Sequence, residues 1–514
     1  METDYIVVGT GSAGSVLANR LSETPGVQVL VLEAGARDKD KFVHIPAAFS
    51  KLFTSDVDWH YATEPQKELD GREIFWPRGK MLGGSSSMNA MMWVRGFAAD
   101  YDEWGAAAGE SWSYDSVREY FTRIERGPLV VSRQRSPRTL TTAWLSAIAE
   151  CGYRTEAPNQ DAPEGFCETQ VTQRRGARWS TADAYLKPVL RRPNLAVTTN
   201  AMVTRVVIED GRATGVEYRH DGRTHVARAR REVVLCGGAI NSPQLLMLSG
   251  IGDRERLADH GIDAVHHAPE VGQNLMDHLC VPVGFDVAGD SLYAAEKPLE
   301  LANYLLRRRG MLTSNVGEAY GFVRSREDLE LPDLELIFAP APFFDEGIGP
   351  GHSGHAVVMG PILVKPRSRG TITLRSADPL TKPVIDPRYL SDPDGADRAA
   401  LMAGLRITAR IADSSTMRGL LRGIARPAEA TELDEGTLER ALETVSHTLY
   451  HPVGTCRMGS DDASVVDPEL RVRGVDGLRV ADASIMPTII RGHTHAPSVM
   501  IGEKASDLIR SARH

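Results

Sequence analysis

The sequence predicts a mixed α/β fold built from two or more packed units. Its 514 residues, of which 42% are hydrophobic, are too many for one simple core. At the N-terminus a strand, a glycine-rich turn, a helix and a second strand follow one another, and residues 196–236 have the pattern of a β meander. Residues 290–445 mix strand and helix patterns. We therefore expect a parallel sheet at the start of the chain and a second unit in its middle.

Composition excludes several classes of protein. The net charge of −9 and the lack of a large Lys/Arg block argue against a nucleic-acid partner. No apolar run approaches the roughly 18 residues that a membrane span needs, and no signal peptide precedes the first strand. The five cysteines are scattered and form no CxxC pair, so neither a metal site nor a disulfide framework is indicated. A reduced, cytoplasmic setting is expected.

The N-terminal segment has the order of a Rossmann-like βαβ unit. Residues 4–8 form a short apolar run rich in β-branched side chains, which is typical of a buried parallel strand. GTGSAG follows at residues 9–14, then the helical pattern SVLANRLSE, then a second strand at residues 27–32 that ends on Glu33. This context predicts that the unit binds a dinucleotide.

Each conspicuous residue of this unit has a physical role in dinucleotide binding. Gly9 allows the tight turn, Gly11 lets the backbone approach a pyrophosphate, and Gly14 lets helix and strand pack closely. The helix N-terminus offers unpaired N–H groups to the phosphates. Glu33 is placed to accept a hydrogen bond from a ribose hydroxyl. This motif alone does not separate NAD from FAD.

A second glycine-rich and serine-rich segment, WPRGKMLGGSSSMNAMMWVRG, spans Trp76 to Gly96. Its glycines, serines and asparagine supply a loop rich in backbone groups that suits a flat polar ring. A helix N-cap with serine donors is the alternative interpretation.

Six ordered motifs give the chain a resemblance to a known family. They are GTGSAGSVLANRLSE with LEAG, RGKMLGGSSSMNAM, GGAINSPQLLMLSGIG, VGQNLMDH, HPVGTCRMG and GLRVADASIMP. With them the chain resembles the glucose–methanol–choline (GMC) family of FAD-dependent oxidoreductases over nearly its whole length. It is most similar to the bacterial members that are choline dehydrogenase-like or aryl-alcohol and hydroxymethylfurfural oxidase-like.

The resemblance implies an FAD site. In it, Gly9, Gly11, Ser12, Gly14, Glu33 and Ala34 hold the ADP half; Arg78, Gly83, Gly84, Ser85, Asn89 and Met91 line the flavin; Val203 meets the adenine side; Asp482 and Ala483 lie at the ribityl and pyrophosphate region; and His493 and Thr494 belong to the flavin-facing segment. Some members link FAD covalently through a histidine of the glycine-rich and serine-rich loop. Met88 stands at that position here and cannot form the bond, so non-covalent FAD is expected.

The resemblance also implies a discontinuous domain arrangement. Residues 1–285 and 446–514 would form the FAD-binding domain, and residues 286–445 the substrate domain, a six-stranded antiparallel sheet with helices. Residues of about 140–195 are possible members of the substrate domain. The segment after Arg126 is shorter than in relatives, which removes the basis for inferring a lid there.

Two histidines near the C-terminus carry the predicted chemistry. Oxidising an alcohol removes a hydroxyl proton and a carbon-bound hydride, and imidazole is the side chain suited to taking the proton near neutral pH. By resemblance, His451 in HPVGT is the general base. His493 would be the second group, which holds the substrate oxygen and orients the C–H bond.

The other histidines are expected to have lesser roles. His447 lies one helical turn before His451 in the predicted pattern and is interpreted as a packing or hydrogen-bonded group. His278, in VGQNLMDH, is interpreted as structural. His495 is expected to support the flavin-facing segment, with a cofactor contact as the alternative.

Four further side chains are weighed between a functional and a structural interpretation. Glu318 would attract a cationic substrate if it lay over the pocket; a surface or ion-paired carboxylate is the alternative. Phe343 and Phe344 suit either an aromatic gate or the buried core. Cys456 is expected to be a buried core residue.

The leading hypothesis is FAD-dependent oxidation of a primary alcohol to an aldehyde, with oxygen or another carrier as electron acceptor. Two alternatives stay open at this point. The same scaffold hosts a hydroxynitrile lyase, in which the histidines work alone, and an NAD-linked Rossmann dehydrogenase would share the N-terminal motif.

Overall fold

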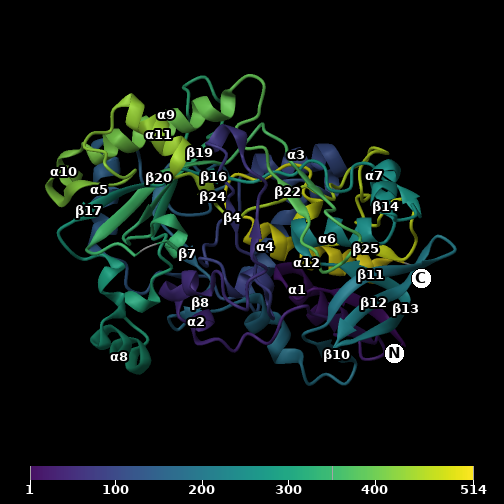
Figure 1. Cartoon of the computed structure of the whole chain (residues 1–514). Coiled ribbons are helices and arrows are strands. Elements are labelled where there is room, and N and C mark those ends of the chain that lie inside the picture. The colour runs from purple at the N-terminus through teal and green to yellow at the C-terminus, as the bar shows by residue number, and fades with distance from the viewer. Residues whose placement is uncertain (1, 350, 513–514) are drawn as a thin grey trace.

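Two sheets organise the molecule, and the computed structural model describes them over residues 2–349 and 351–512. Figure 1 shows the first sheet on the right, where both chain termini lie, and the second on the left under a layer of helices. No helix among the described residues is long and apolar enough to cross a membrane.

The first sheet has the order β10-β2-β1-β13-β12-β11, and β25 pairs with β13. Strands β10, β2, β1, β13 and β25 run parallel, whereas β13, β12 and β11 form the antiparallel meander. The strands are β1 (Glu2–Val8), β2 (Val29–Leu32), β10 (Leu195–Thr198), β11 (Met202–Glu209), β12 (Arg212–His220), β13 (Arg223–Leu235) and β25 (Leu478–Val480). This sheet thus takes strands from both ends of the chain.

Local sequence explains the meander. Asp210 and Gly211 have φ of 49° and 76°, and Asp221 and Gly222 have φ of 48° and 72°. Two successive residues with positive φ make the tight hairpin turn that Asp-Gly pairs favour. These turns fix the register of β11, β12 and β13.

The two ends of the chain are also joined by helices. Helix α1 (Ser12–Leu21) packs against α12 (His495–Ser511). Arg20 on α1 donates to both carboxylate oxygens of the buried Glu503 on α12, at 2.9 and 2.8 Å. This bidentate pair ties the N-terminal βαβ unit to the C-terminal helix.

The second sheet is antiparallel. Six strands follow the order β23-β17-β20-β19-β18-β6, and two short ones are added, since β16 pairs with both β20 and β24. The strands are β6 (Phe166–Glu168), β16 (Leu279–Cys280), β17 (Val283–Val287), β18 (Ala319–Val323), β19 (Leu334–Ala339), β20 (Ala356–Leu363), β23 (Leu421–Arg426) and β24 (His447–Thr448). Strands β6, β16 and β24 lie outside residues 286–445, and β17 begins before residue 286. The sheet is therefore wider than the six strands expected.

The helices α9 (Ala396–Ala412) and α5 (Thr139–Glu150) pack on the second sheet. The remaining α-helices are α2 (Lys41–His44), α3 (Ala98–Ala108), α4 (Tyr114–Arg126), α6 (Gly238–Leu248), α7 (Arg254–Asp259), α8 (Pro298–Arg307), α10 (Ser415–Leu420) and α11 (Glu435–Thr444). Helix α4 ends at Arg126, and a short segment containing β5 (Ser132–Arg133) leads from it to α5. Further strands form two-stranded pairs, namely β3 (Tyr61–Ala62) with β4 (Phe75–Trp76), β5 with β7 (Gln170–Val171), β8 (Gln173–Arg174) with β9 (Ala177–Arg178), β14 (Ile251–Gly252) with β15 (His266–His267), and β21 (Thr371–Thr373) with β22 (Val384–Asp386).

Candidate active site

A cavity of about 330 Å³ is lined by residues from both sheets. Of the predicted cofactor residues, fifteen line it: Gly9, Gly11, Ser12, Glu33, Ala34, Arg78, Gly84, Ser85, Asn89, Met91, Val203, Asp482, Ala483, His493 and Thr494. His451 lines the same cavity. The structure thus gathers segments that lie more than 400 residues apart in the chain.

Gly14 and Gly83 do not line the cavity, and their need for glycine has another cause. A Cβ added to Gly14 would lie 2.1 Å from the carbonyl oxygen of Gly9. Gly83 has a φ of 88°, and its added Cβ would lie 2.2 Å from Ser87 Oγ. Gly14 therefore allows the close packing of α1 on the turn, and Gly83 shapes the loop behind the cavity wall.

The turn between β1 and α1 presents bare backbone to the cavity. Gly9 has a φ of 97°, which favours glycine, and no atom lies within 4 Å of a Cβ added to Gly11. Helix α1 has no side-chain N-cap at Gly11, so its first N–H groups are available to a ligand. Open space over a helix N-terminus is the arrangement that holds a pyrophosphate.

Glu33 holds the turn as well as lining the cavity. Its carboxylate accepts from Thr10 N at 2.9 Å, Thr10 Oγ1 at 2.6 Å and Gly35 N at 2.8 Å. Burial raises its pKa, and these hydrogen bonds oppose the rise. An ionised carboxylate has about four acceptor sites, which leaves one for a ribose hydroxyl.

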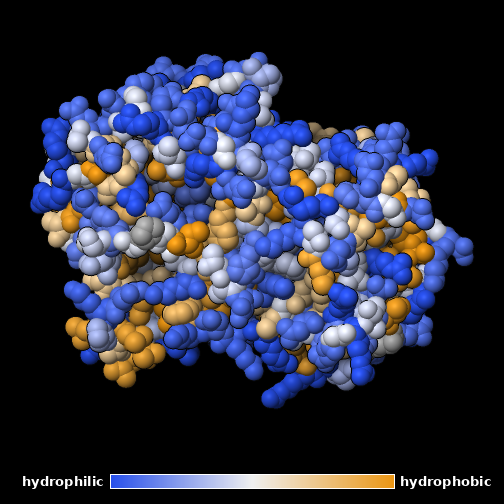
Figure 2. All heavy atoms as spheres, in the orientation of Figure 1, coloured by the Kyte–Doolittle hydropathy of each residue, from blue (hydrophilic) through white to orange (hydrophobic). Residues whose placement is uncertain are grey.

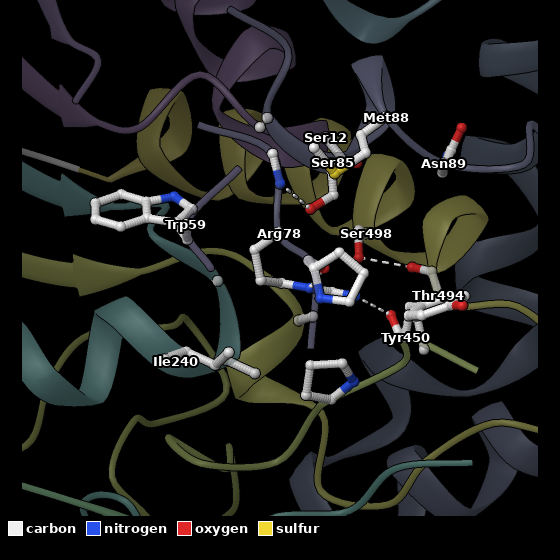
Figure 3. A pocket seen from close by; sticks show the side chains of 18 of the residues that line it. Ser12, Trp59, Arg78, Ser85, Met88, Asn89, Ile240, Tyr450, Thr494 and Ser498 are labelled. Atoms are coloured by element: carbon white, nitrogen blue, oxygen red, sulfur yellow. Dashed lines mark hydrogen bonds between the residues drawn. The ribbon is translucent and has the colours of Figure 1, made fainter. Parts of the chain in front are cut away.

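The loop of residues 83–91 packs its backbone onto the β1–α1 turn. A Cβ added to Gly84 would lie 2.9 Å from the Cα of Gly11. Asn89 Oδ1 accepts from Met91 N at 3.0 Å and from Arg178 at 2.7 Å, which fixes the end of the loop. Figure 3 shows Ser85 and Met88 near Ser12 at one side of the cavity.

Arg78 and Asp482 brace the cavity from two other sides. Figure 3 shows Arg78 between Trp59 and Tyr450, and its guanidinium donates to the Tyr450 carbonyl at 2.6 Å. Asp482 accepts from Gly238 N at 2.8 Å and from Ser242 Oγ at 2.6 Å, both at the start of α6. Burial raises the pKa of the Asp482 carboxyl, and the hydrogen bonds oppose the rise.

His451 and His493 form a pair of buried imidazoles. Their ring centroids lie 4.8 Å apart in an edge-to-face arrangement, and the two residues are 8% and 5% exposed. The backbone N–H of His451 donates to Asp277 Oδ1 at 2.7 Å, which positions the segment after β24. Burial lowers the pKa of His451 well below its usual value, and the neighbouring His493, His278 and Arg78 lower it further. His451 is therefore a neutral imidazole near pH 7.

Each imidazole of the pair has one nitrogen occupied by a buried partner. His451 Nδ1 lies 3.0 Å from Nδ1 of His278, which is fully buried and whose pKa burial lowers to about 3. His493 Nε2 lies 3.0 Å from Oε1 of Glu335 on β19, also fully buried. The nitrogens left for a substrate are Nε2 of His451 and Nδ1 of His493.

Known proteins match this chain over nearly all of its length. The family model of the GMC oxidoreductases matches residues 3–280 with its N-terminal part and residues 366–502 with its C-terminal part. The chain belongs to the GMC oxidoreductase family. GMC oxidoreductases are FAD-dependent, which favours the flavin over the nicotinamide alternative.

Two curated relatives and two solved structures illustrate the likeness. A GMC-type oxidoreductase of Mycobacterium tuberculosis is 70% identical, with 99% of both chains covered. The alcohol dehydrogenase [acceptor] of Pseudomonas putida is 41% identical, with 98% of this chain and 95% of the relative covered. Pyridoxine 4-oxidase from Mesorbium loti has a TM-score of 0.89 at 30% identity over the whole of both chains. Formate oxidase of Aspergillus oryzae has a TM-score of 0.92 at 28% identity, covering 99% and 98%.

Of the further candidates in this GMC oxidoreductase, Phe343 lines the cavity, whereas Glu318 and Phe344 do not. Glu318 is fully buried and accepts from Ser314 Oγ, Thr141 Oγ1 and Arg138 N at 2.6, 2.6 and 2.7 Å, so it neither lies over the pocket nor on the surface. Phe343 lines the cavity, whereas Phe344 packs in the core behind it.

Of the other predicted residues, His447 and Cys456 are buried and His495 is half-buried. His447 lies in β24 rather than a helical turn, because this segment pairs with β16; its Nδ1 is 2.7 Å from the Thr448 carbonyl. His495 begins α12, lines the cavity and lies 2.9 Å from Ser12 Oγ through Nδ1. Cys456 is fully buried in the hydrophobic core.

One wall of the cavity, contributed by the second sheet, its loops and residues 46–53, is apolar and aromatic. It is formed by Phe49, Phe53, Val316, Ile337, Ala339, Phe343, Val358 and Tyr450. Among the described residues, the only acids that line the cavity are Glu33 and Asp482, and both are already bonded to protein donors. This wall favours an uncharged apolar molecule.

The sequence did not reveal the contacts that Glu335 and His278 make with the histidine pair. Glu335 lies inside an apolar strand pattern, and its partner His493 is 158 residues away. His278 stood in a motif, but its contact with His451 depends on the pairing of β16 with β24.

Proposed function

We propose that this protein oxidises a primary alcohol to the aldehyde, with non-covalent FAD, His451 as general base and His493 as the group that holds the substrate oxygen. The observation that carries the proposal is the buried pair of imidazoles in the same cavity as a helix N-terminus with open backbone.

FAD fits the residues that are present. The space over Gly11, the uncapped start of α1 and the spare acceptor site of Glu33 suit the ADP half. His495 lines the cavity, and its Nε2 is buried and makes no hydrogen bond to a described residue. When bound, FAD supplies an acceptor for the hydride of the alcohol carbon. Met88, at the position where some relatives carry the linking histidine, leaves the cofactor dissociable.

His451 takes the hydroxyl proton at Nε2. Acting as a base requires a lone pair there, so the neutral ring carries its own proton on Nδ1. His278 then accepts that N–H through its Nδ1 and carries its proton on Nε2. Because burial lowers the pKa of both rings, this arrangement persists at neutral pH.

His493 holds the substrate oxygen through Nδ1. A carboxylate oxygen accepts, so we infer that the shared hydrogen is donated by His493 Nε2. A proton on Nδ1 would donate to the developing alkoxide, and the Glu335 carboxylate would balance the resulting charge.

The apolar wall points to an uncharged substrate. Glu318, which would have been the attraction for a cationic alcohol, is enclosed by Ser314, Thr141 and Arg138. We expect benzyl alcohol to have a higher kcat/KM than choline. A preference for choline would contradict this assignment.

Anaerobic mixing of the flavoprotein with benzyl alcohol tests the reaction. Loss of the visible flavin absorbance, with formation of aldehyde, is the expected result. Cleavage of a cyanohydrin with the absorbance unchanged would instead show the lyase. Acid precipitation tests the linkage: the flavin should stay in the supernatant, and a yellow pellet would contradict non-covalent binding.

A further inference from the structure

Helix α8 turns its apolar residues toward solvent. Leu299, Leu305 and Leu306 are 78%, 61% and 85% exposed, and Leu301 is 43% exposed. Figure 2 shows an apolar patch at the lower left, at the place where α8 projects from the molecule in Figure 1. We call this helix, with the flanking turns at Leu292–Glu296 and Met311–Thr313, the α8 arm.

The orientation of α8 is the reverse of that of an ordinary surface helix. At 3.6 residues per turn, Leu299, Leu301, Leu305 and Leu306 fall within an arc of roughly 160°. The side that faces the protein is polar. Tyr304 is buried and donates to the His44 carbonyl at 2.8 Å, and Glu300 accepts from Met311 N at 2.9 Å. These bonds fix the leucines outward, and an exposed apolar patch of this kind marks a contact surface.

The C-terminal end of the patch is basic. Arg307, Arg308 and Arg309 are all exposed, as is Lys297 at the other end of the helix. Arg174 and Arg175 are also exposed. They lie near Arg308, because a Cβ added to the next residue, Gly176, would be 2.7 Å from the Arg308 carbonyl. The acids of the arm are engaged, Glu296 by Lys51 and Glu300 by the backbone. In a chain of net charge −9, this concentration of positive charge is local.

We propose that the α8 arm docks this protein onto an anionic lipid bilayer. An amphipathic helix with outward leucines and flanking arginines meets both requirements of the membrane interface, an apolar layer beneath negatively charged headgroups. A second copy of the chain fits less well, because the acids of the arm, Glu296 and Glu300, are already engaged, and no acid among the described residues of the arm is left to pair with the arginines of the other copy. The bilayer complements the apolar and the basic parts of the surface at once.

Docking through the α8 arm would also set where the active-site cavity lies relative to the bilayer. Leu292 and Ala295 of the arm belong to the same apolar cluster as Phe49 and Phe53, which line the cavity. The arm therefore connects the membrane contact to the apolar wall of the active site through packed side chains.

Flotation of the FAD-loaded protein with vesicles tests the proposal. Vesicles of equal parts phosphatidylcholine and phosphatidylglycerol should carry the protein upward, and raising the salt concentration should release part of it. The Leu299→Ser/Leu306→Ser variant should bind at least tenfold more weakly, because it removes two leucine side chains from the apolar layer of the bilayer. Replacing Arg307, Arg308 and Arg309 by Gln should weaken binding by up to about a hundredfold and remove most of the salt dependence, at roughly fivefold per basic residue.

Two matched controls lie away from the arm. Leu380→Ser removes another exposed leucine, and Arg219→Gln/Arg223→Gln removes exposed arginines from β12 and β13, on the opposite side of Figure 1. Both should float like the unaltered protein, and circular dichroism checks that every variant is folded. The proposal is overturned if the unaltered protein stays with the buffer, or if the arm variants float equally well. It is also overturned if the leucine variant loses a dimer seen without lipid, since a second copy would then cover the patch.

Discussion

Replacing His278 by Phe tests the contact that we propose to hold the Nδ1 proton of His451, the proposed base. The substitution keeps a planar ring in a fully buried site and removes the acceptor 3.0 Å from His451 Nδ1. A buried N–H left without a partner costs about 1–3 kcal/mol. If that cost is borne in the reactive state, where His451 holds the substrate proton, the rate of flavin reduction falls by about 5- to 150-fold. The loss should appear in that rate and leave KM nearly unchanged, because His278 does not line the cavity.

His278→Asn is the matched control. The amide oxygen of Asn lies near the place of Nδ1 and can accept the same hydrogen bond, although the smaller side chain leaves some space. We expect this variant to keep most of the rate that the Phe variant loses. Stopped-flow flavin reduction at several alcohol concentrations separates the rate from KM, and bound flavin is measured in both variants. A Phe variant with unaltered rate, or Asn and Phe variants with equal losses, would refute the role given to His278.

Three further predictions follow from the same geometry. His451→Ala should keep FAD and lose about 10²–10⁴-fold in turnover, whereas His493→Asn should lose less because an amide still donates; an unchanged kcat for the Ala variant would exclude a general base at this position. Glu335→Gln keeps the shape but removes the carboxylate that contacts His493, so flavin reduction should slow about tenfold with the flavin retained, and a rate equal to that of the unaltered enzyme counts against a role for this carboxylate. Burial lowers the pKa of His447 to about 4, so below pH 6.5 the unfolded chain binds a proton that the folded chain does not. The free energy of unfolding should therefore be steady above pH 7 and fall by about 2 kcal/mol for this group at pH 5; denaturant titrations should show a smaller fall in His447→Gln, and an identical pH dependence would contradict the assignment.

The sequence predicted those features that depend on neighbours in the chain. The β1–α1–β2 unit follows from a short apolar run, a turn that needs Gly9 and a helical pattern, all within 33 residues. The two hairpins of the meander follow from Asp-Gly pairs whose residues adopt positive φ. His451 was found in the motif HPVGT and His493 by its resemblance to the second position of the family, and both line the cavity.

Features that depend on tertiary pairing were beyond the sequence pattern. A spacing of four residues between His447 and His451 suggested a helical turn, yet pairing with β16 makes the segment a strand. Glu318 has the same residue type as a charged substrate-binding group, and only the fold shows that three protein donors enclose it. Glu335 occupies an apolar strand, where nothing along the chain distinguishes a carboxylate that serves an active site.

The proposed chemistry draws on both sheets: residues of the second sheet support the histidine pair, and residues of the first would hold the cofactor. Their buried partners belong to the second sheet or its edge: Glu335 lies on β19, and His278 directly precedes β16. The turn at Gly11 and the carboxylate of Glu33 that would hold the ADP half belong to the first sheet. The distance between base and cofactor is therefore fixed by the docking of one sheet against the other, not by either motif alone. A residue with no substrate contact, such as His278, would then affect the rate because it belongs to the sheet that carries the proposed base.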